Sequence, residues 1–136
     1  MNLVFADTSY YVALMTARDQ WHTVAVKASE NYSGDVLTTE FVLTEVGNFL
    51  HRPPDRELFR VLIEAIRSDR QTKIIEADSR TFEAGLHLYL SRNDKSWSLT
   101  DCISFVVMNE YGINEALTSD THFEQAGFRP LMNATT

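Results

Sequence analysis

The sequence predicts a single α/β domain over residues 1–136, with a mostly parallel sheet of about five strands covered by helices on both faces. Short apolar runs alternate along the chain with longer segments of helical periodicity, and this alternation is typical of parallel sheets. With 136 residues, 44% of them hydrophobic, the chain is long enough to bury one core. It contains no repeat or linker-like stretch, so one domain is the simplest interpretation.

The N-terminal elements follow from apolar runs and turn residues. The run 2–6 predicts a buried strand, and Asp7 after it has the chemistry of a helix N-cap. The apolar stretch 10–15 and the more polar segment 21–32 are expected to be helical. A Ser-Gly-Asp turn then leads into a second strand at 36–38.

Proline and amphipathic spacing define the middle of the chain. A helix over 39–51 should stop before Pro53, because proline disfavours helix at the preceding residue. In the segment 55–70, apolar residues recur three and four positions apart, which predicts an amphipathic helix. A third strand is expected at 73–75.

The remaining elements are two helices and two strands. One helix is capped by residue 78 or 79, and the next runs from Ser98 to about Tyr111, where Gly112 ends it. Strands are expected at 116–118 and 128–131. The last of these contains a proline, so it should lie at an edge of the sheet.

Composition narrows the classes of function. A net charge of −7 argues against nucleic-acid binding by bulk electrostatics, although bound divalent cations can invert the local field of an acidic site. The single cysteine, Cys102, cannot form an internal disulfide, which indicates a reducing, cytoplasmic location. No apolar run approaches the roughly 18–20 residues of a membrane span, and no signal peptide is expected.

Four carboxylates should converge at one edge of the sheet. Asp7 follows the first strand and Asp120 follows the fourth, and ligand sites form outside the carboxyl ends of parallel strands. The helix from Ser98 leads into the fourth strand, so Asp101 in its first turn should lie at the same edge. Glu45 lies in the helix after the second strand, and its side chain tilts back towards the helix N-terminus.

Glu45 carries the most information because of its neighbours. Val42, Val46 and Phe49 form an apolar stripe that is expected to face inward, so the Glu45 carboxylate borders the core. Burial of a lone carboxylate is costly unless something compensates for it. A cluster of carboxylates suits hard, oxygen-seeking cations such as Mg²⁺ or Mn²⁺.

Each acid also has a purely structural interpretation. In this interpretation Asp7 is a helix N-cap without a further role, and Asp101, three residues after Ser98, completes a capping box. Asp120 can be a turn residue, and Glu45 can extend into solvent. The functional hypothesis depends on their joint placement, since several unneutralised carboxylates at one edge would repel one another.

Four motifs in a fixed order resemble those of a known family. They are Phe5-Ala6-Asp7-Thr8-Ser9, Leu43-Thr44-Glu45-Val46-Gly47, Ser98-Leu99-Thr100-Asp101-Cys102, and Leu117-Thr118-Ser119-Asp120 with Phe123. Together they resemble PIN-domain nucleases over essentially the whole chain, and most closely the VapC-type toxins of bacterial VapBC toxin–antitoxin pairs.

The resemblance implies a five-stranded parallel sheet of order 3-2-1-4-5, Mg²⁺ at the acidic pocket and sequence-selective RNA cleavage. It also implies a homodimer that is inhibited by a cognate antitoxin protein. Thr8 and Thr118 match hydroxyl positions that support the site in relatives.

The resulting hypothesis is a metal-dependent endoribonuclease. Asp7 and Asp101 anchor a Mg²⁺ ion, or Mn²⁺, and Asp120 and Glu45 bind it directly or through water. The cation activates a water for in-line attack on a phosphodiester, with a second metal if substrate completes its shell. The four histidines lack i, i+4 pairing and are interpreted as ordinary residues, although one of them, His122, is near enough to Asp120 to touch substrate.

Basic and aromatic residues suggest how RNA or a partner is held. One face of the 55–70 helix can contact RNA phosphates or an acidic antitoxin segment, and the alternative is a solvated face paired with Glu57 or Glu64. Its cationic residues are Arg56, Arg60, Arg67 and Arg70. Four aromatic residues either stack on bases or fill the core, namely Tyr10, Tyr11, Trp21 and Trp97. In the family that the sequence resembles, the helices around the exit of the second strand help to form the dimer. The resemblance therefore makes three residues candidates for the dimer interface, namely Phe49, Leu50 and Phe59.

Other classes fit less well. A phosphatase of the haloacid dehalogenase kind needs an acid two residues after the first aspartate, where this chain has Ser9. A receiver-like signalling domain usually has adjacent acids after the first strand and a late lysine, and neither occurs here. An RNA-binding PIN domain without cleavage, or a housekeeping nuclease for RNA or DNA processing, are the alternatives within the fold.

Overall fold

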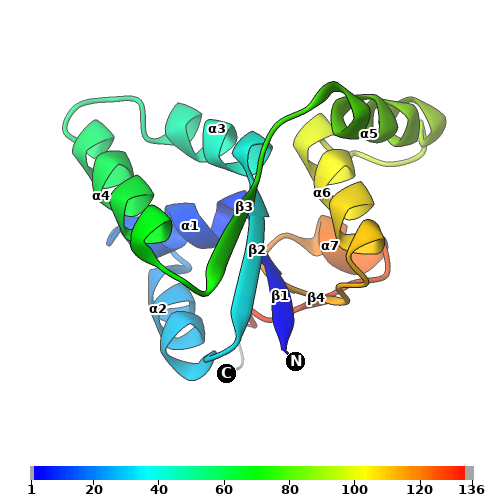
Figure 1. Cartoon of the computed structure of the whole chain (residues 1–136). Coiled ribbons are helices and arrows are strands. Elements are labelled where there is room, and N and C mark those ends of the chain that lie inside the picture. Colours follow the sequence, from blue (N-terminus) through cyan, green and yellow to red (C-terminus); the bar gives the residue numbers. More distant parts are fainter. Residues whose placement is uncertain (1, 134–136) are drawn as a thin grey trace.

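The computed structural model describes residues 2–133 and contains one sheet flanked by helices (Figure 1). The strands are β1 (Leu3–Ala6), β2 (Asp35–Thr39), β3 (Thr72–Ile75), β4 (Glu115–Leu117) and β5 (Arg129–Pro130). The helices are α1 (Thr8–Met15), α2 (His22–Asn31), α3 (Glu40–Phe49), α4 (Asp55–Ser68), α5 (Ser79–Ser91), α6 (Leu99–Glu110) and α7 (Thr121–Gln125).

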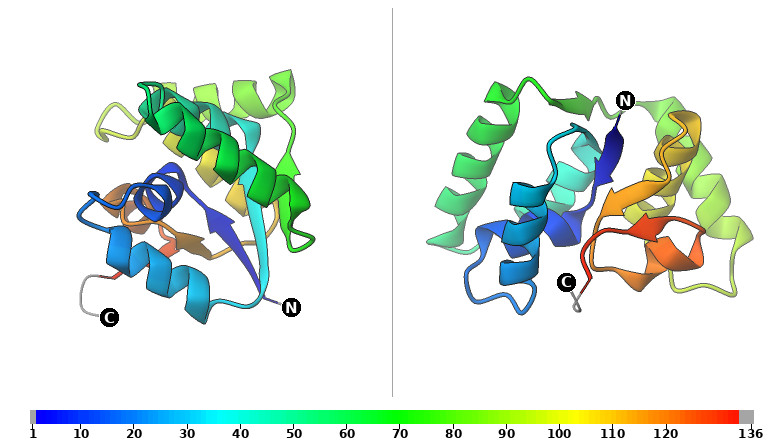
Figure 2. Two further views of the ribbon diagram at one scale, coloured as in Figure 1. Left: turned by 90° about the vertical axis from the view of Figure 1, so that its left-hand side faces the viewer. Right: turned by 90° about the horizontal axis from the view of Figure 1, so that it is seen from below.

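The sheet has the order β3-β2-β1-β4-β5, and every pair of neighbouring strands is parallel. The strand order implied by the family resemblance is therefore confirmed. Helices α1, α2 and α4 lie on one side of the sheet, and α5, α6 and α7 lie on the other (Figures 1 and 2). The proline-containing strand β5 is at an edge, as expected from its missing backbone donor.

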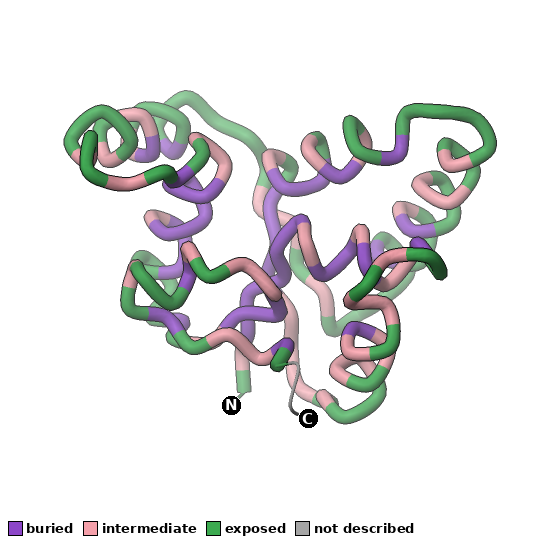
Figure 3. The backbone as a smooth tube through the Cα atoms, turned by 180° about the vertical axis from the view of Figure 1, so that it is seen from behind, coloured by how far each residue is buried: buried purple, intermediate pink, exposed green. Residues whose placement is uncertain are grey.

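The core surrounds the central strand β1, whose residues Val4, Phe5 and Ala6 are almost fully buried. In Figure 3 the buried residues follow β1, parts of β2 and β4 and the inner sides of the helices, whereas β3, β5 and most of α4 and α5 are intermediate or exposed. Such two-sided burial requires the continuous apolar run that the sequence has here.

Aromatic packing fixes the C-terminal part against this core. The Phe123 ring lies 5.0 Å from that of Phe105 in an edge-to-face arrangement and 6.4 Å from that of Phe5. Because Phe123 belongs to α7, the short helix is anchored beside the end of β1.

Helix α7 is the main difference from the sequence prediction, which assigned no helix or strand between the fourth and fifth strands. Asp120 is its N-cap and accepts a hydrogen bond from the backbone N–H of His122. Five residues are too few to show helical periodicity, so only the capping residues Asp120 and Gly127 could have indicated it. The predicted end of the preceding helix is confirmed, because Gly112 has a φ of +65° after α6.

Helix α4 also differs in detail. It ends at Ser68, two residues earlier than predicted, and its apolar stripe is only partly covered. Leu62 and Ile66 are buried, but Val61 is 46% exposed. Across the described residues, no helix combines the length and apolar character needed to cross a membrane.

Candidate functional site

Five carboxylates line one cavity of about 230 Å³ at the carboxyl-terminal edge of the sheet. Four of them belong to Asp7, Glu45, Asp101 and Asp120, the residues selected from the sequence, and the fifth belongs to Asp19, which was not selected. A larger hollow of about 310 Å³ between α1, α2 and α4 has Asp69 as the one acid among the described residues that line it. The concentration of acids, rather than size, identifies the candidate site.

Asp7 is held at the N-terminus of α1, where it caps the helix and is 3% exposed. Its Oδ2 accepts hydrogen bonds from Thr118 Oγ1 at 2.8 Å and from Ser9 Oγ at 3.0 Å. Both side-chain donors reach the same oxygen, which leaves Oδ1 for another ligand. Capping and ligand binding are therefore compatible in this residue.

The environment of Asp7 opposes its ionisation. Burial raises its pKa to about 7, and the negative charge of Asp101 adds to the rise. The hydrogen bonds from Thr118 and Ser9 lower the pKa but do not offset burial. Any cation in the cavity would reverse this balance, because it favours the charged form.

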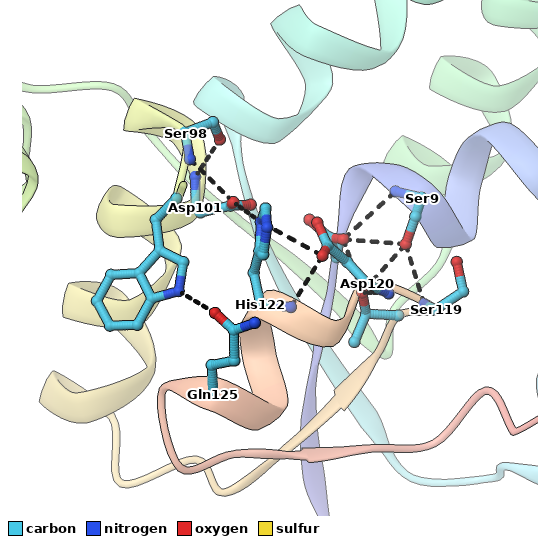
Figure 4. Close-up of polar contacts among 10 residues, drawn as sticks. Ser9, Ser98, Asp101, Ser119, Asp120, His122 and Gln125 are labelled. Atoms are coloured by element: carbon cyan, nitrogen blue, oxygen red, sulfur yellow. Dashed lines mark hydrogen bonds and ion pairs between the residues drawn. The ribbon is translucent and has the colours of Figure 1, made fainter. Parts of the chain in front are cut away.

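Asp101 has a similar arrangement in the first turn of α6. Ser98 and Asp101 form the predicted capping box, in which Asp101 Oδ2 accepts the Ser98 N–H at 3.0 Å. The same oxygen lies 2.8 Å from His122 Nδ1 (Figure 4). Burial raises the pKa of Asp101 as well.

His122 connects two of the acids. Its Nδ1 lies 2.8 Å from Asp101 Oδ2 and 3.4 Å from Asp120 Oδ1. Ligand atoms of Asp101, Asp120 and His122 all lie within 4.8 Å of one another. His122 therefore contacts the acidic cluster, which the interpretation of the four histidines as ordinary residues did not include. Its position two residues after Asp120 was the available signal.

Glu45 differs from the three aspartates. It is partly exposed on α3, and its carboxylate forms no hydrogen bond or ion pair within the described chain. Val42 and Val46 are fully buried, as predicted, but Phe49 is 64% exposed and lines the cavity. The prediction of an inward-facing Phe49 is wrong, because the adjacent Leu50 is the residue that packs into the core at this end of α3, and Phe49 lies at the cavity instead.

Hydroxyl groups join the ends of β1 and β4. Thr118 Oγ1 donates to Asp7, lies 3.1 Å from Ser9 Oγ and accepts the backbone N–H of Asp120 at 3.0 Å. Ser9, which was not among the residues selected from the sequence, also accepts the Ser119 N–H at 3.1 Å. Thr8 Oγ1 is buried and has no hydrogen-bond partner in the described chain.

The cavity has the donor set of a site for a hard divalent cation. No lysine or arginine is among the described residues that line it, so its carboxylates have no cationic partner there. The unpartnered Thr8 hydroxyl adds an oxygen at the cavity wall. Carboxylate and hydroxyl oxygens are ligands for cations such as Mg²⁺ and Mn²⁺, so the residues present fit such an ion.

The cationic face of α4 is partly occupied by its own acids. Arg60 pairs with Glu57 and Glu64, which confirms the solvated-face alternative for this residue. Arg56 donates to the backbone carbonyl of His51 at 3.1 Å. Contact of RNA or antitoxin with the four arginines stays a prediction.

Most of the candidate contact residues elsewhere are core residues. Tyr10, Tyr11 and Trp97 are buried, whereas Trp21 lines the acidic cavity. Leu50, a candidate for the dimer interface, is only 3% exposed and packs inside this chain, so that expectation is wrong.

Comparison with known proteins adds relatives that match nearly the whole chain. The "23S rRNA-specific endonuclease VapC20" of Mycobacterium tuberculosis is 29% identical over 126 residues, which are 93% of this chain and 95% of the relative. Its crystal structure, described as that of a sarcin–ricin loop cleaving toxin, matches with a TM-score of 0.84 at 28% identity and covers 93% of this chain and 96% of that one.

Two more distant structures share the fold. VapBC2 of Rickettsia felis, bound to a DNA fragment from their promoter, has a TM-score of 0.63 at 11% identity and covers 95% of this chain and 97% of that chain. FitAcB of Neisseria gonorrhoeae has a TM-score of 0.65 at 14% identity, and the match covers 93% of this chain and 94% of that chain. The PIN domain family model matches residues 4–129, and this protein therefore belongs to the PIN-domain family.

Proposed function

We propose that this protein is a metal-dependent endoribonuclease and the toxin of a VapBC-type toxin–antitoxin pair. The observation that carries the proposal is one cavity lined by five carboxylates, four of them at the residues selected from the sequence, and by no lysine or arginine among the residues described. Such a cavity attracts cations and repels phosphate until a cation is bound. The name of the VapC20 relative, an endonuclease, supports the same activity.

Mg²⁺ or Mn²⁺ is the proposed cofactor, with Asp7 and Asp101 as principal ligands and Asp120 and Glu45 binding directly or through water. When bound, the cation supplies activation of a water molecule and neutralises charge on the phosphate that is attacked. Asp7 and Asp101 each present one oxygen that no described side chain occupies. Thr118 and Ser9 hold Asp7 in place, and Thr8 is proposed to support water in the cavity.

The chain's own residues also shape access to the reaction. Asp7 and Asp101 are buried, so water reaches them only through the cavity. Trp21 and Phe49 lie at the cavity wall, where apolar rings limit water and leave room for a nucleotide. The partly exposed Glu45 faces the same space and can orient the attacking water.

Ribosomal RNA of the large subunit is the first substrate to test, because the VapC20 relative is named for cleavage of 23S rRNA. The proposed partners are a cognate antitoxin protein and a second copy of this chain. The cytoplasmic location predicted from the sequence accompanies this proposal, since RNA and antitoxin are both met there.

The decisive experiment incubates the purified protein with intact ribosomes, with total RNA and with tRNA, with and without Mg²⁺. The matched variants are Asp7→Asn and Asp101→Asn, which keep the size of the side chain but remove its charge. Asp94→Asn, the same change at an exposed aspartate outside the cavity, is the matched control. We expect discrete RNA fragments with wild type and Asp94→Asn only, and only when the cation is present.

Cleavage that persists in excess chelator, or in both aspartate variants, would overturn the proposal. A wild-type protein that binds RNA but cleaves none of these substrates with Mg²⁺ or Mn²⁺ would favour RNA binding without cleavage.

A further inference from the structure

We propose that His122 is a positioning residue of the cation pocket, which holds Asp101 through Nδ1 so that one carboxylate oxygen faces the cavity. The inference rests on the proposed metal-dependent function. It assigns to His122 a hydrogen-bonding role towards the ligands instead of direct coordination of the cation.

The geometry of Asp101 supports this role. Its Oδ2 receives the Ser98 N–H at 3.0 Å and lies 2.8 Å from His122 Nδ1. The capping box needs only Ser98, so the contact with His122 is additional to helix capping. Two donors on Oδ2 leave Oδ1 as the oxygen available to a cation.

Asp7 shows the same arrangement independently. Its Oδ2 is held by Thr118 and Ser9, and its Oδ1 has no side-chain donor in the described chain. Residues that hydrogen-bond to metal ligands fix the orientation of those ligands and increase their affinity for the metal. His122 therefore holds Oδ2 of Asp101 in the way that Thr118 holds Oδ2 of Asp7.

Direct coordination through Nδ1 would break this arrangement. With Asp101 ionised, Nδ1 carries the proton of the short hydrogen bond, and a nitrogen that donates a proton has no lone pair for a metal. Coordination would require removal of that proton and separation of the ring from Asp101. Hard cations of the Mg²⁺ class also prefer oxygen ligands.

The position of His122 is set by other contacts of α7. Phe123 is fully buried, and Gln125 Oε1 accepts the Trp97 indole N–H at 3.1 Å (Figure 4). Both contacts hold α7 beside the start of α6 without the imidazole. Substitution of His122 should therefore leave the fold intact, so a change in cation binding can be assigned to the missing hydrogen bond.

Two amides separate the roles of the ring nitrogens. In His122→Asn the amide nitrogen takes nearly the place of Nδ1 and still donates to Asp101. In His122→Gln the amide nitrogen takes nearly the place of Nε2, so Asp101 has no donor there. His122→Ala has a nitrogen at neither position. The matched control is His87→Asn, at an exposed histidine of α5.

Mn²⁺ affinity is measured by calorimetry on the full chain, with thermal unfolding without cation as the test of folding. We expect His122→Ala and His122→Gln to bind Mn²⁺ about 10–100-fold more weakly than wild type, the range for residues that support metal ligands. His122→Asn should bind within a few-fold of wild type, and His87→Asn should bind as wild type does. Pulsed electron paramagnetic resonance should show no directly bound imidazole nitrogen.

Equal Mn²⁺ affinity in wild type, His122→Ala and His122→Gln would overturn the inference and leave the proposed function standing. A strong ¹⁴N coupling to bound Mn²⁺ that disappears in His122→Asn would also overturn it, in favour of direct coordination. Failure of wild type to bind Mn²⁺ at all would instead contradict the proposed function, so the two failures are distinguishable.

Discussion

The acidic cavity and the surface of α4 use the same kinds of charge in opposite ways. On α4, Arg60 stands between Glu57 and Glu64, and all three are exposed to solvent, which screens them. In the cavity, buried carboxylates face one another with no lysine or arginine among the described lining residues. The charges of the first region are paired with one another, whereas the carboxylates of the second have no cationic partner among the described lining residues.

The difference shows which charges to associate with function. Exposed pairs three and four positions apart on a helix contribute little to stability and occur without any functional need. Buried carboxylates with raised pKa values oppose folding when ionised, and they indicate a ligand that compensates for this. The comparison can be tested by changing pH, cation and charge in each region separately.

The largest expected effect is the pH dependence of the protein without cation. The folded-state pKa of Asp7, about 7, lies above the ordinary aspartate value of 3.8. The folded state therefore binds more protons between these values, and stability falls as pH rises from about 4 to about 7. From the size of the shift, the decrease is at most about 4 kcal/mol. Asp7→Asn should flatten this profile in urea unfolding measured at pH 5 and pH 8.

Equal stability of wild type at pH 5 and pH 8 in the presence of chelator would contradict the assignment of Asp7 as an acid whose ionisation opposes folding. Glu64→Gln on α4 is the control, because that acid is exposed and paired, and it should leave the pH profile unchanged.

The second effect is stabilisation by the cation itself. Binding to the folded state alone stabilises a protein by about 2.7 kcal/mol at a concentration one hundred times Kd. We expect Mn²⁺ to raise the Tm of wild type at pH 8 and to raise that of Asp7→Asn much less. Differential scanning calorimetry checks this. An unchanged Tm for wild type in millimolar Mn²⁺ would mean that the cavity does not bind the ion.

A smaller effect is expected at Glu45, the acid without a partner in the described chain. Because it is partly exposed, Glu45→Gln should leave the Tm without cation unchanged. The variant should still lower kcat with Mg²⁺, since the carboxylate faces the cavity. Steady-state cleavage of a short RNA measures this. A kcat equal to that of wild type would remove Glu45 from the proposed site.

The smallest effect is expected on α4. Replacement of Arg67 and Arg56 by Ala should weaken RNA binding slightly and flatten its salt dependence by about 0.7 in log–log slope for each phosphate that the variant no longer neutralises. Binding to the inactive Asp101→Asn protein across a salt series measures the slope. An unchanged slope would show that α4 has only the solvated role that Arg60 already has.

The sequence was sufficient for the sheet and for most of the acids because both leave local signals. The apolar run of β1 required burial on both faces, and Asp7 follows it directly. Parallel strand order then brings the ends of β1 and β4 to the same edge. The location of Asp101 was predictable from two independent rules. The helix that leads into β4 must begin at this edge of the sheet, and the capping-box spacing after Ser98 places Asp101 in the first turn of that helix.

Contacts between distant segments were not predictable in the same way. The position of His122 two residues after Asp120 places it near that acid, but the sequence does not indicate that its ring reaches Asp101, because this contact joins α7 to the start of α6. Ser9 was overlooked for the same reason, since its partners Thr118 and Ser119 lie at the other end of the chain. Phe49 and Leu50 are adjacent, yet only the packing of α3 decides that one is exposed and the other buried.

The amino-acid sequence by itself determined the alternation of strands and helices, the family resemblance and the four acids at one edge, because periodicity and parallel topology constrain them locally. Only the tertiary structure decided which oxygen of Asp7 and Asp101 is left free, and that His122 touches two of the acids. Hydrogen bonds act over about 3 Å, and the relative placement of side chains at that scale results from the packing of the whole core.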